Sequence, residues 1–157
     1  MSTLQPLADR FAFNDRFLDQ LTQGFGEQDW HHRAGEANHA QWLLGHLAAT
    51  RRWALRLLGL ATEEQPWEAH FGQGRRPSPL SDDIAPELLR EAFLNAGETL
   101  RAHLAAATPA QIDAGFREFP DGSRTMGGGV HFLHFHEAYH LGQLGLLRRA
   151  AGKPGLA

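Results

Sequence analysis

Two histidines near the end of the chain are spaced so that both could bind one metal ion. His136 and His140 stand four residues apart in the stretch His136-Glu137-Ala138-Tyr139-His140. A helix turns by about 100° per residue, so this spacing places both imidazoles on one face. The stretch matches the HExxH pattern, in which zinc peptidases use two His ligands and a Glu base. Such enzymes take a third ligand downstream, but no acidic residue follows Glu137 and no histidine follows His140. A peptidase is therefore disfavoured, and if a metal ion binds here, its third ligand has to come from upstream.

His46 is the best-placed candidate for that third ligand. It lies at the centre of an apolar stripe whose members are Trp42, Leu43, Thr50 and Trp53. Burying three imidazoles costs free energy unless each finds a partner. Spacing alone leaves two interpretations open. Each of the three could be a hydrogen-bonded core residue, or His46, His136 and His140 could converge on one metal ion.

Three further residues near these histidines are candidates for a part in catalysis. Gln143 shares the buried face and could hydrogen-bond a ligand imidazole or a water on the metal, or form an ordinary bond between helices. Tyr139 could donate a proton near the site, although a core aromatic is the more usual role. Glu137 points about 100° away from His136, towards the rim of the buried face, where it could handle protons.

The elements that must position these groups are helices. Leu and Ala, with 23 residues each, far outnumber two Ile and one Val, which favours helices over strands. Apolar spacings of three, four and seven predict long helices at 4–24, 38–60, 83–104 and 126–151. The segment 61–81, which contains Pro and Gly, is interpreted as a crossover loop. The sequence therefore predicts one all-α domain over residues 1–157, a four-helix bundle with a long crossover loop between helices 2 and 3.

Five arginines lie along the second helical stretch or in the crossover: Arg51, Arg52, Arg56, Arg75 and Arg76. Their positive charge could attract an acidic substrate or a thiol cofactor. A solvated face with ordinary ion pairs is the simpler interpretation, and we expect it for these residues.

Small residues in the last helical stretch suggest close contacts at two places. The three glycines at 127–129 could cradle an anion with their backbone amides, but close packing or a turn is the more usual reason for such a run. Ala138, Gly142 and Gly145 form a strip on the outer side of the helix. This strip suggests a close contact with another helix, as in a homodimer.

Composition and charge exclude several classes of protein. The chain has 157 residues, no Cys and a formal net charge of −3. Without Cys there is no disulfide, no thiolate ligand and no cysteine nucleophile, so any metal has to be held by the ten His or by carboxylates. Because the net charge is slightly negative, the sequence does not predict binding to nucleic acid or to an anionic membrane. Charged residues interrupt the amino end, and no apolar run reaches the roughly 20 residues that span a bilayer. We expect a soluble, cytoplasmic protein.

Two stretches resemble the DinB/YfiT-like superfamily of four-helix bundles. One is NHAQWLLGHLAATRR at residues 38–52, and the other is HFLHFHEAYHLGQLGLLRRAAG at residues 131–152. In the family, the first stretch holds one ligand His and the second holds two, four residues apart. The resemblance covers nearly the whole chain. It implies that His46, His136 and His140 bind one divalent transition metal ion, zinc or nickel in reported members.

The resemblance also implies candidate functions, each with a small-molecule substrate if the protein is an enzyme. Relatives of this fold include transferases that join a low-molecular-weight thiol, of the bacillithiol or mycothiol type, to a small electrophile. Because this chain has no Cys, such a thiol would have to be a cosubstrate. A metal-dependent hydrolase of a small amide or ester is one alternative, and a non-catalytic, stress-related metal-binding protein is another.

Overall fold

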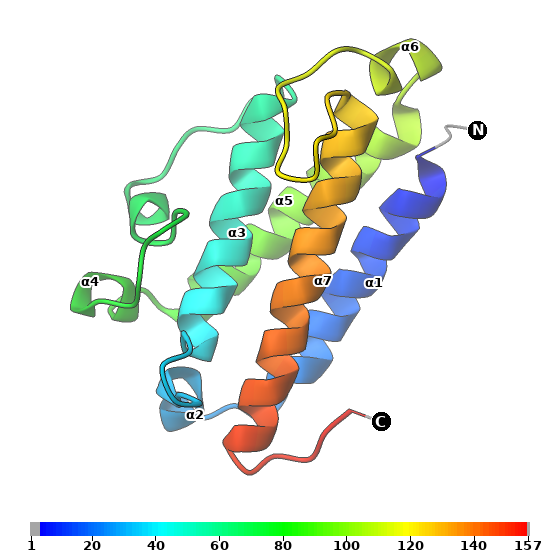
Figure 1. Ribbon diagram of the computed structural model, residues 1–157. Helices are drawn as coiled ribbons and strands as arrows, with labels where there is room; N and C mark the ends of the chain where they lie inside the picture. Colours follow the sequence, from blue (N-terminus) through cyan, green and yellow to red (C-terminus); the bar gives the residue numbers. More distant parts are fainter. Residues whose placement is uncertain (1–3, 157) are drawn as a thin grey trace.

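Four long helices form the body of the protein in the computed structural model, which describes residues 4–156 (Figure 1). They are α1 (Gln5–Thr22), α3 (Ala40–Leu57), α5 (Pro86–Ala106) and α7 (Met126–Ala150). Helix α3 packs against α5 and α7, and α1 packs against the same two helices, so that the four form a bundle. The predicted all-α four-helix bundle is confirmed, and each long helix lies within a few residues of its expected bounds.

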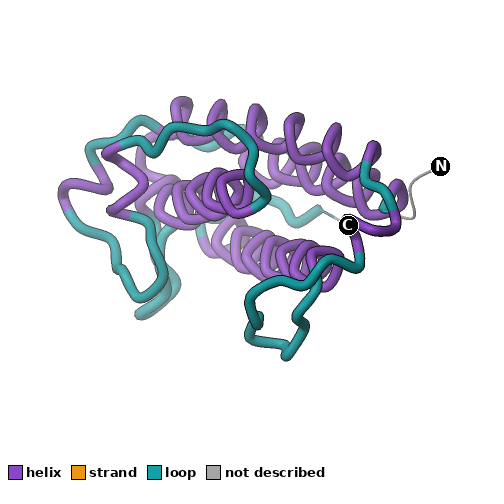
Figure 2. Tube along the Cα trace, turned by 90° about the horizontal axis from the view of Figure 1, so that it is seen from above, coloured by secondary structure: helices purple, strands orange, loops and turns teal. Residues whose placement is uncertain are grey.

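Short helices interrupt the connections between the long ones. They are α2 (Glu27–His31), the 3₁₀ helix η1 (Pro66–His70), α4 (Pro79–Asp82) and α6 (Pro109–Ile112). Figure 2 shows the longest connections running beside the long helices. The crossover between α3 and α5 is therefore more than a loop, because η1 and α4 give it local structure. Within the described part of the chain, no helix is long and apolar enough to cross a membrane.

The crossover is anchored to α3 by ion pairs and by a close contact. The buried carboxylate of Glu68 accepts hydrogen bonds from Arg52 Nε at 2.7 Å and from Arg56 Nη2 at 2.6 Å. The ring of Phe71 fills the space beside Gly45, where a Cβ atom would come within 2.3 Å of the ring. These contacts hold the crossover against the middle of α3. The expectation of ion pairs is confirmed for Arg52 and Arg56.

The expectation of a solvated face is wrong for Arg51, which is completely buried. Its Nε and Nη2 donate to the two carboxylate oxygens of Glu137 at 2.5 and 2.9 Å, and its Nη1 donates to Asp15 at 2.6 Å. The guanidinium carbon lies 3.5 Å from the centroid of the Phe93 ring. Burial by itself lowers the pKa of Arg51, but Glu137 and Asp15 outweigh it and raise the pKa above its usual value. Two carboxylates and an aromatic ring thus take the place of the water that would surround this side chain if it were exposed.

The glycines at 127–129 allow close packing over the first turn of α7. A Cβ atom on Gly129 would come within 2.2 Å of the Phe119 ring, and one on Gly127 within 2.8 Å of the Ile112 side chain. Phe119 belongs to the connection between α6 and α7, which folds back over this turn. The interpretation of the glycine run as a packing feature is confirmed.

Candidate metal centre

Three histidines from two helices meet between α3 and α7. His46 lies in α3, and His136 and His140 lie one turn apart in α7. The Nε2 atom of His136 is 3.0 Å from Nε2 of His46 and 3.2 Å from Nε2 of His140. His46 is buried, and the other two are half-buried. The structure therefore brings together the three residues that the sequence predicts as ligands of one metal ion.

The local sequence explains how α3 holds its imidazole. Trp42, one turn before His46, stacks on the His46 ring with centroids 5.2 Å apart and an interplanar angle of 7°. On the other side, the missing side chain of Gly45 lets Phe71 reach α3. The backbone oxygen of Phe71 lies 2.7 Å from His46 Nδ1. The crossover therefore supplies the atom that orients the ring.

Hydrogen-bond partners define which nitrogen of two rings carries the proton. A backbone oxygen only accepts, so His46 Nδ1 donates to Phe71. His140 Nδ1 lies 2.7 Å from the side-chain oxygen of Gln143 and donates to it. In both rings Nε2 is then a bare lone pair that faces the other histidines. Partners that fix the second ring nitrogen in this way are usual for metal-binding histidines.

The three imidazole rings cannot all be satisfied by hydrogen bonds to one another. The Nε2 atoms of His46 and His140 are both acceptors, and His136 Nε2 between them carries at most one hydrogen. The other nitrogen of His136, Nδ1, is buried without a hydrogen-bond partner among the described residues. A cation bound by the three Nε2 atoms would satisfy them together. The residues present therefore fit a metal ion held by three imidazoles.

The surroundings keep the three imidazoles uncharged. Burial lowers the pKa of His46 and of His140, although the hydrogen bonds to Phe71 and Gln143 oppose this effect. The pKa of His136 falls to about 3, because the ring is buried and lies beside the other two histidines. Neutral imidazoles with available lone pairs are the form that binds a metal ion.

The three candidate catalytic residues lie in different environments. Gln143 contacts the centre directly, as the acceptor for His140. Tyr139 is 58% exposed, so the expectation of a core aromatic is wrong, although its ring lies edge-on to the ring of His140. Glu137 is expected at the rim of the buried face but is completely buried, where Arg51 and Asn14 donate to its carboxylate. Because Asn14, Arg51 and Glu137 belong to α1, α3 and α7, these hydrogen bonds link the three helices.

A second group of possible ligands, His31, His39 and Asp82, lies at the start of α3. His39 Nδ1 accepts the backbone N–H of Trp42 at 3.2 Å and so caps the helix. Its Nε2 therefore carries the proton and donates to Asp82 at 3.0 Å. His39 has no lone pair left for a metal ion. The group is explained as a helix cap rather than a metal site.

Sequence reasoning misses two features that position the centre, the buried Arg51–Glu137 pair and the Phe71 carbonyl. The pair has a sequence signal, because Glu137 lies four residues from both Leu133 and Leu141 on an apolar stripe. A carboxylate in that position needs a buried partner of opposite charge. The Phe71 carbonyl has no such signal, since every residue carries a backbone oxygen.

Helical bundles often build metal sites from side chains on facing helices, and this chain is an all-α bundle with a candidate three-histidine centre between α3 and α7. The family model of the DinB superfamily matches residues 11–144, and the chain therefore belongs to this superfamily. A comparison with curated proteins finds no match.

Proposed function

We propose that the protein binds one divalent transition metal ion through the Nε2 atoms of His46, His136 and His140, and that it acts as a metal-dependent enzyme. The convergence of these three atoms from two helices carries the proposal. Imidazole ligands suit zinc and nickel, the metals that the family resemblance implies.

The reaction we propose is transfer of a low-molecular-weight thiol, of the bacillithiol or mycothiol type, to a small electrophile. When bound, the ion would supply a Lewis-acid position that keeps the sulfur deprotonated yet nucleophilic. A bond forms between this sulfur and the electrophile, whose leaving group departs with its electron pair, and the thiol proton passes to solvent. The protein orients two ligands through Phe71 and Gln143 and has no thiol of its own.

The position of Glu137 supports thiol transfer over hydrolysis of an amide or ester. Hydrolysis benefits from a base that accepts a proton from water, and Glu137 is the acidic residue next to the ligands in the sequence. Arg51 and Asn14 already occupy its two carboxylate oxygens. A thiol ionises far more readily than water and therefore has less need of a base.

Metal analysis tests the first step of the proposal. Purified protein, offered zinc or nickel at neutral pH, is expected to hold about one ion per chain. His136→Ala should abolish this binding, whereas His131→Ala, which changes an exposed His in the same helix, should leave it intact. Wild-type protein that stays empty, or a His136→Ala variant that still binds one ion, would overturn the proposed site.

A panel of thiols tests the reaction. Bacillithiol, mycothiol, glutathione and coenzyme A are each incubated with 1-chloro-2,4-dinitrobenzene and metal-loaded protein, and loss of free thiol is followed. We expect at least one thiol to be consumed, with no consumption after chelation or in His136→Ala. Turnover of an ester without thiol use would instead support a hydrolase. If the protein binds the ion but shows neither activity, this result would support a non-catalytic metal-binding protein.

We also propose that two copies of the chain associate through the outer face of α7. Ala138 and Gly142 are exposed there, as the small-residue strip predicts, whereas Gly145 is half-buried beside Leu21 of α1. Three large apolar or aromatic side chains of the same helix are exposed beside them: Phe135, Tyr139 and Leu146. Apolar surface that gathers in this way commonly marks an interface.

A further inference from the structure

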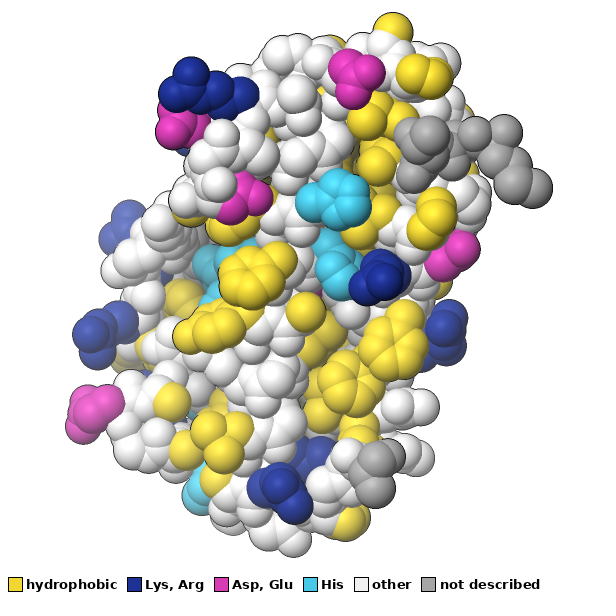
Figure 3. Space-filling view, turned by 45° about the vertical axis from the view of Figure 1, so that its right-hand side comes forward, with side chains coloured by type: hydrophobic (Ala, Val, Ile, Leu, Met, Phe, Trp, Pro, Cys, Tyr) yellow, Lys and Arg dark blue, Asp and Glu magenta, His cyan; other side chains and the backbone are white. Residues whose placement is uncertain are grey.

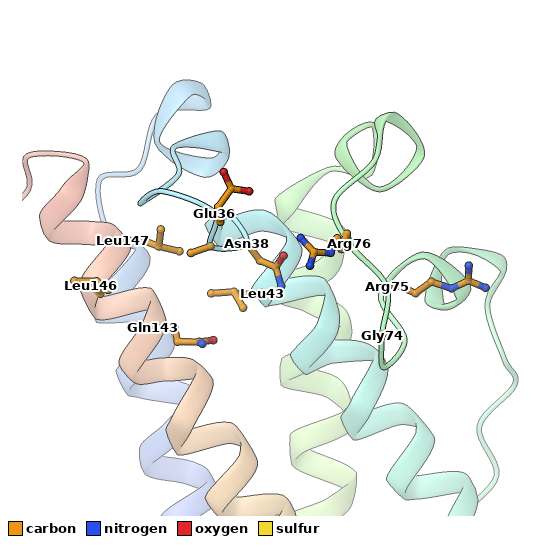
Figure 4. Close-up of a pocket in the computed structure, with 10 residues that line it drawn as sticks. Glu36, Asn38, Leu43, Gly74, Arg75, Arg76, Gln143, Leu146 and Leu147 are labelled. Atoms are coloured by element: carbon orange, nitrogen blue, oxygen red, sulfur yellow. The ribbon is translucent and has the colours of Figure 1, made fainter.

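A cavity of about 460 Å³ lies beside the histidine centre, where α7 faces the start of α3 and the crossover (Figure 4). Gln143 and Leu147 line it from α7, and Leu43 lines it from α3. Leu146 of α7 and residues 36–38 and 74–76 complete the wall. The volume is in the range of pockets that hold small molecules.

Gln143 connects this cavity to the histidine centre. Its side-chain oxygen accepts the hydrogen of His140 Nδ1, while the same side chain lines the cavity. The amide nitrogen of Gln143 has no hydrogen-bond partner among residues 4–156, so two N–H groups remain for a ligand. In Figure 4 the side chain extends from α7 towards α3. A molecule in the cavity would therefore lie next to a residue that touches the centre.

Arg76 brings an uncommitted positive charge to the opposite wall. Its guanidinium makes no ion pair with any residue that the structure describes. Figure 4 shows the guanidinium directed towards Asn38, whereas the side chain of Arg75 extends in the opposite direction and that of Glu36 extends away from Gln143. One end of the cavity thus offers N–H donors and a positive charge, and Glu36 is the acidic residue of its lining. Leu43 and Leu147 provide apolar surface nearby.

We infer that this cavity binds a small organic carboxylate, with the carboxylate on Arg76 and the carbon chain along Leu43 and Leu147 towards Gln143. A guanidinium can hold a carboxylate through two parallel hydrogen bonds, and the amide groups of Asn38 and Gln143 add donors. The apolar wall suits a short aliphatic chain. The inference also gives a substrate class for the thiol transfer, a thiol or electrophile that carries a carboxylate. This last step rests on the proposed function, but the carboxylate site itself does not.

Calorimetric titration with succinate, and with its uncharged analogue succinamide, tests the site. Succinate should bind wild-type protein at least tenfold more tightly than succinamide. Arg76→Gln should weaken succinate binding about tenfold, the effect of one charge-assisted contact. Arg75→Gln is the matched control, because it removes the neighbouring charge that points away, and it should change binding less than twofold. Both arginines are exposed, so neither change should disturb folding.

Equal binding of succinate and succinamide would overturn the inference. Equal effects of Arg76→Gln and Arg75→Gln would also overturn it, because they would show general electrostatic attraction instead of a site. Inorganic phosphate serves as the competing anion, and phosphate that binds more tightly than succinate would contradict a carboxylate site.

Metal-free protein separates this inference from the proposed function. Succinate binding should survive chelation, since Arg76 does not belong to the histidine centre. Mercaptosuccinate, which adds a thiol, should bind metal-loaded protein at least tenfold more tightly than succinate, and this advantage should disappear on chelation. Arg76-dependent succinate binding without any thiol advantage would leave the carboxylate site standing and count against the thiol chemistry. Tighter binding of mercaptosuccinate than of succinate, without any dependence on Arg76, would support the thiol chemistry and count against the carboxylate site.

Discussion

The carboxylate of Glu137 shows how one residue can follow a catalytic pattern and serve a different purpose. It follows His136 directly in HExxH, but it is completely buried and accepts two hydrogen bonds from Arg51 and one from Asn14. Removing one partner of a buried ion pair leaves an uncompensated charge, which is strongly destabilising. Glu137 is therefore a residue that stabilises the bundle around the candidate ligands.

Replacing Glu137 with Gln distinguishes this role from that of a base. Glu137→Gln should lower the free energy of unfolding by about 3–5 kcal/mol, because Arg51 loses its main counter-charge. Urea titration measures this change, and metal content per folded chain should stay near that of wild type. If Glu137 were a base, the variant would keep its stability and lose activity instead.

The buried histidines predict how the metal-free protein responds to acid. Five histidines have pKa values below the usual one: His39, His46, His134, His136 and His140. Below about pH 6.5 the unfolded chain binds protons at these residues and the native chain does not, so stability falls as the pH falls. The loss should continue towards pH 3, where His136 itself takes up a proton.

Urea unfolding of chelated protein between pH 7 and pH 4 measures this slope. Each histidine protonated only in the unfolded state contributes about 1.4 kcal/mol per pH unit. His136→Ala removes one such residue and should make the slope shallower, while His131→Ala, an exposed change, should not. Stability that is constant over this range would contradict the burial of neutral imidazoles.

Among the elements of the fold, the crossover between α3 and α5 determines how the His46 ring is oriented. Glu68 ties η1 to Arg52 and Arg56, and three residues later the backbone oxygen of Phe71 accepts the hydrogen of His46 Nδ1. Phe71 reaches α3 because residue 45 has no side chain. The orientation of one candidate ligand thus depends on a segment outside the four long helices.

Gly45→Ala tests this dependence. The added Cβ would lie 2.3 Å from the Phe71 ring, so the ring and its backbone have to move away from His46. We expect a loss of stability of about 1–3 kcal/mol, as for other overpacked cores, despite the higher helix propensity of Ala. Metal affinity, measured by competition with a chelator, should fall about 10–100-fold because the partner of Nδ1 is displaced.

A second substitution checks the cause. Phe71→Leu in the Gly45→Ala background reduces the clash and should restore much of the metal affinity. Gly45→Ala that keeps wild-type affinity would show that the Phe71 carbonyl does not orient His46.

The long helices and the face shared by His136 and His140 were predictable because both depend on local periodicity, whereas spacing alone left open whether His46, 90 residues away, joins them. Residues such as Leu89, Phe93 and Leu100 repeat at helical spacing, and the same rule places His136 and His140 on one face. The short helices η1 and α4 were not predicted, since contacts with α3 such as that of Glu68 stabilise them. The partner of a buried charge is equally hidden, because Arg51 and Glu137 lie 86 residues apart.

For the whole molecule, an apolar surface extends over α1 and α7. Figure 3 shows hydrophobic side chains gathered on this face. Phe13 of α1 and Phe135, Tyr139 and Leu146 of α7 are all more than half exposed. Exposing this much apolar surface in water is unfavourable, and burying about 100 Å² of it would yield roughly 2.5 kcal/mol. Two copies related by a twofold axis could bury this face against itself, with Gly142 allowing close approach.

Light scattering after size-exclusion chromatography tests this association. We expect wild-type protein to have the mass of two chains. Phe135→Glu should convert it to the mass of one, because a charge placed in an apolar interface pays its desolvation without a partner. Leu80→Glu is the matched control, since Leu80 in α4 and Phe135 are both 63% exposed, and it should leave the mass unchanged. A monomeric wild type, or equal masses for the two variants, would mean that this face does not join two copies. Metal content measured on the same fractions should be equal in both variants, because each copy contains all three histidines of its own centre.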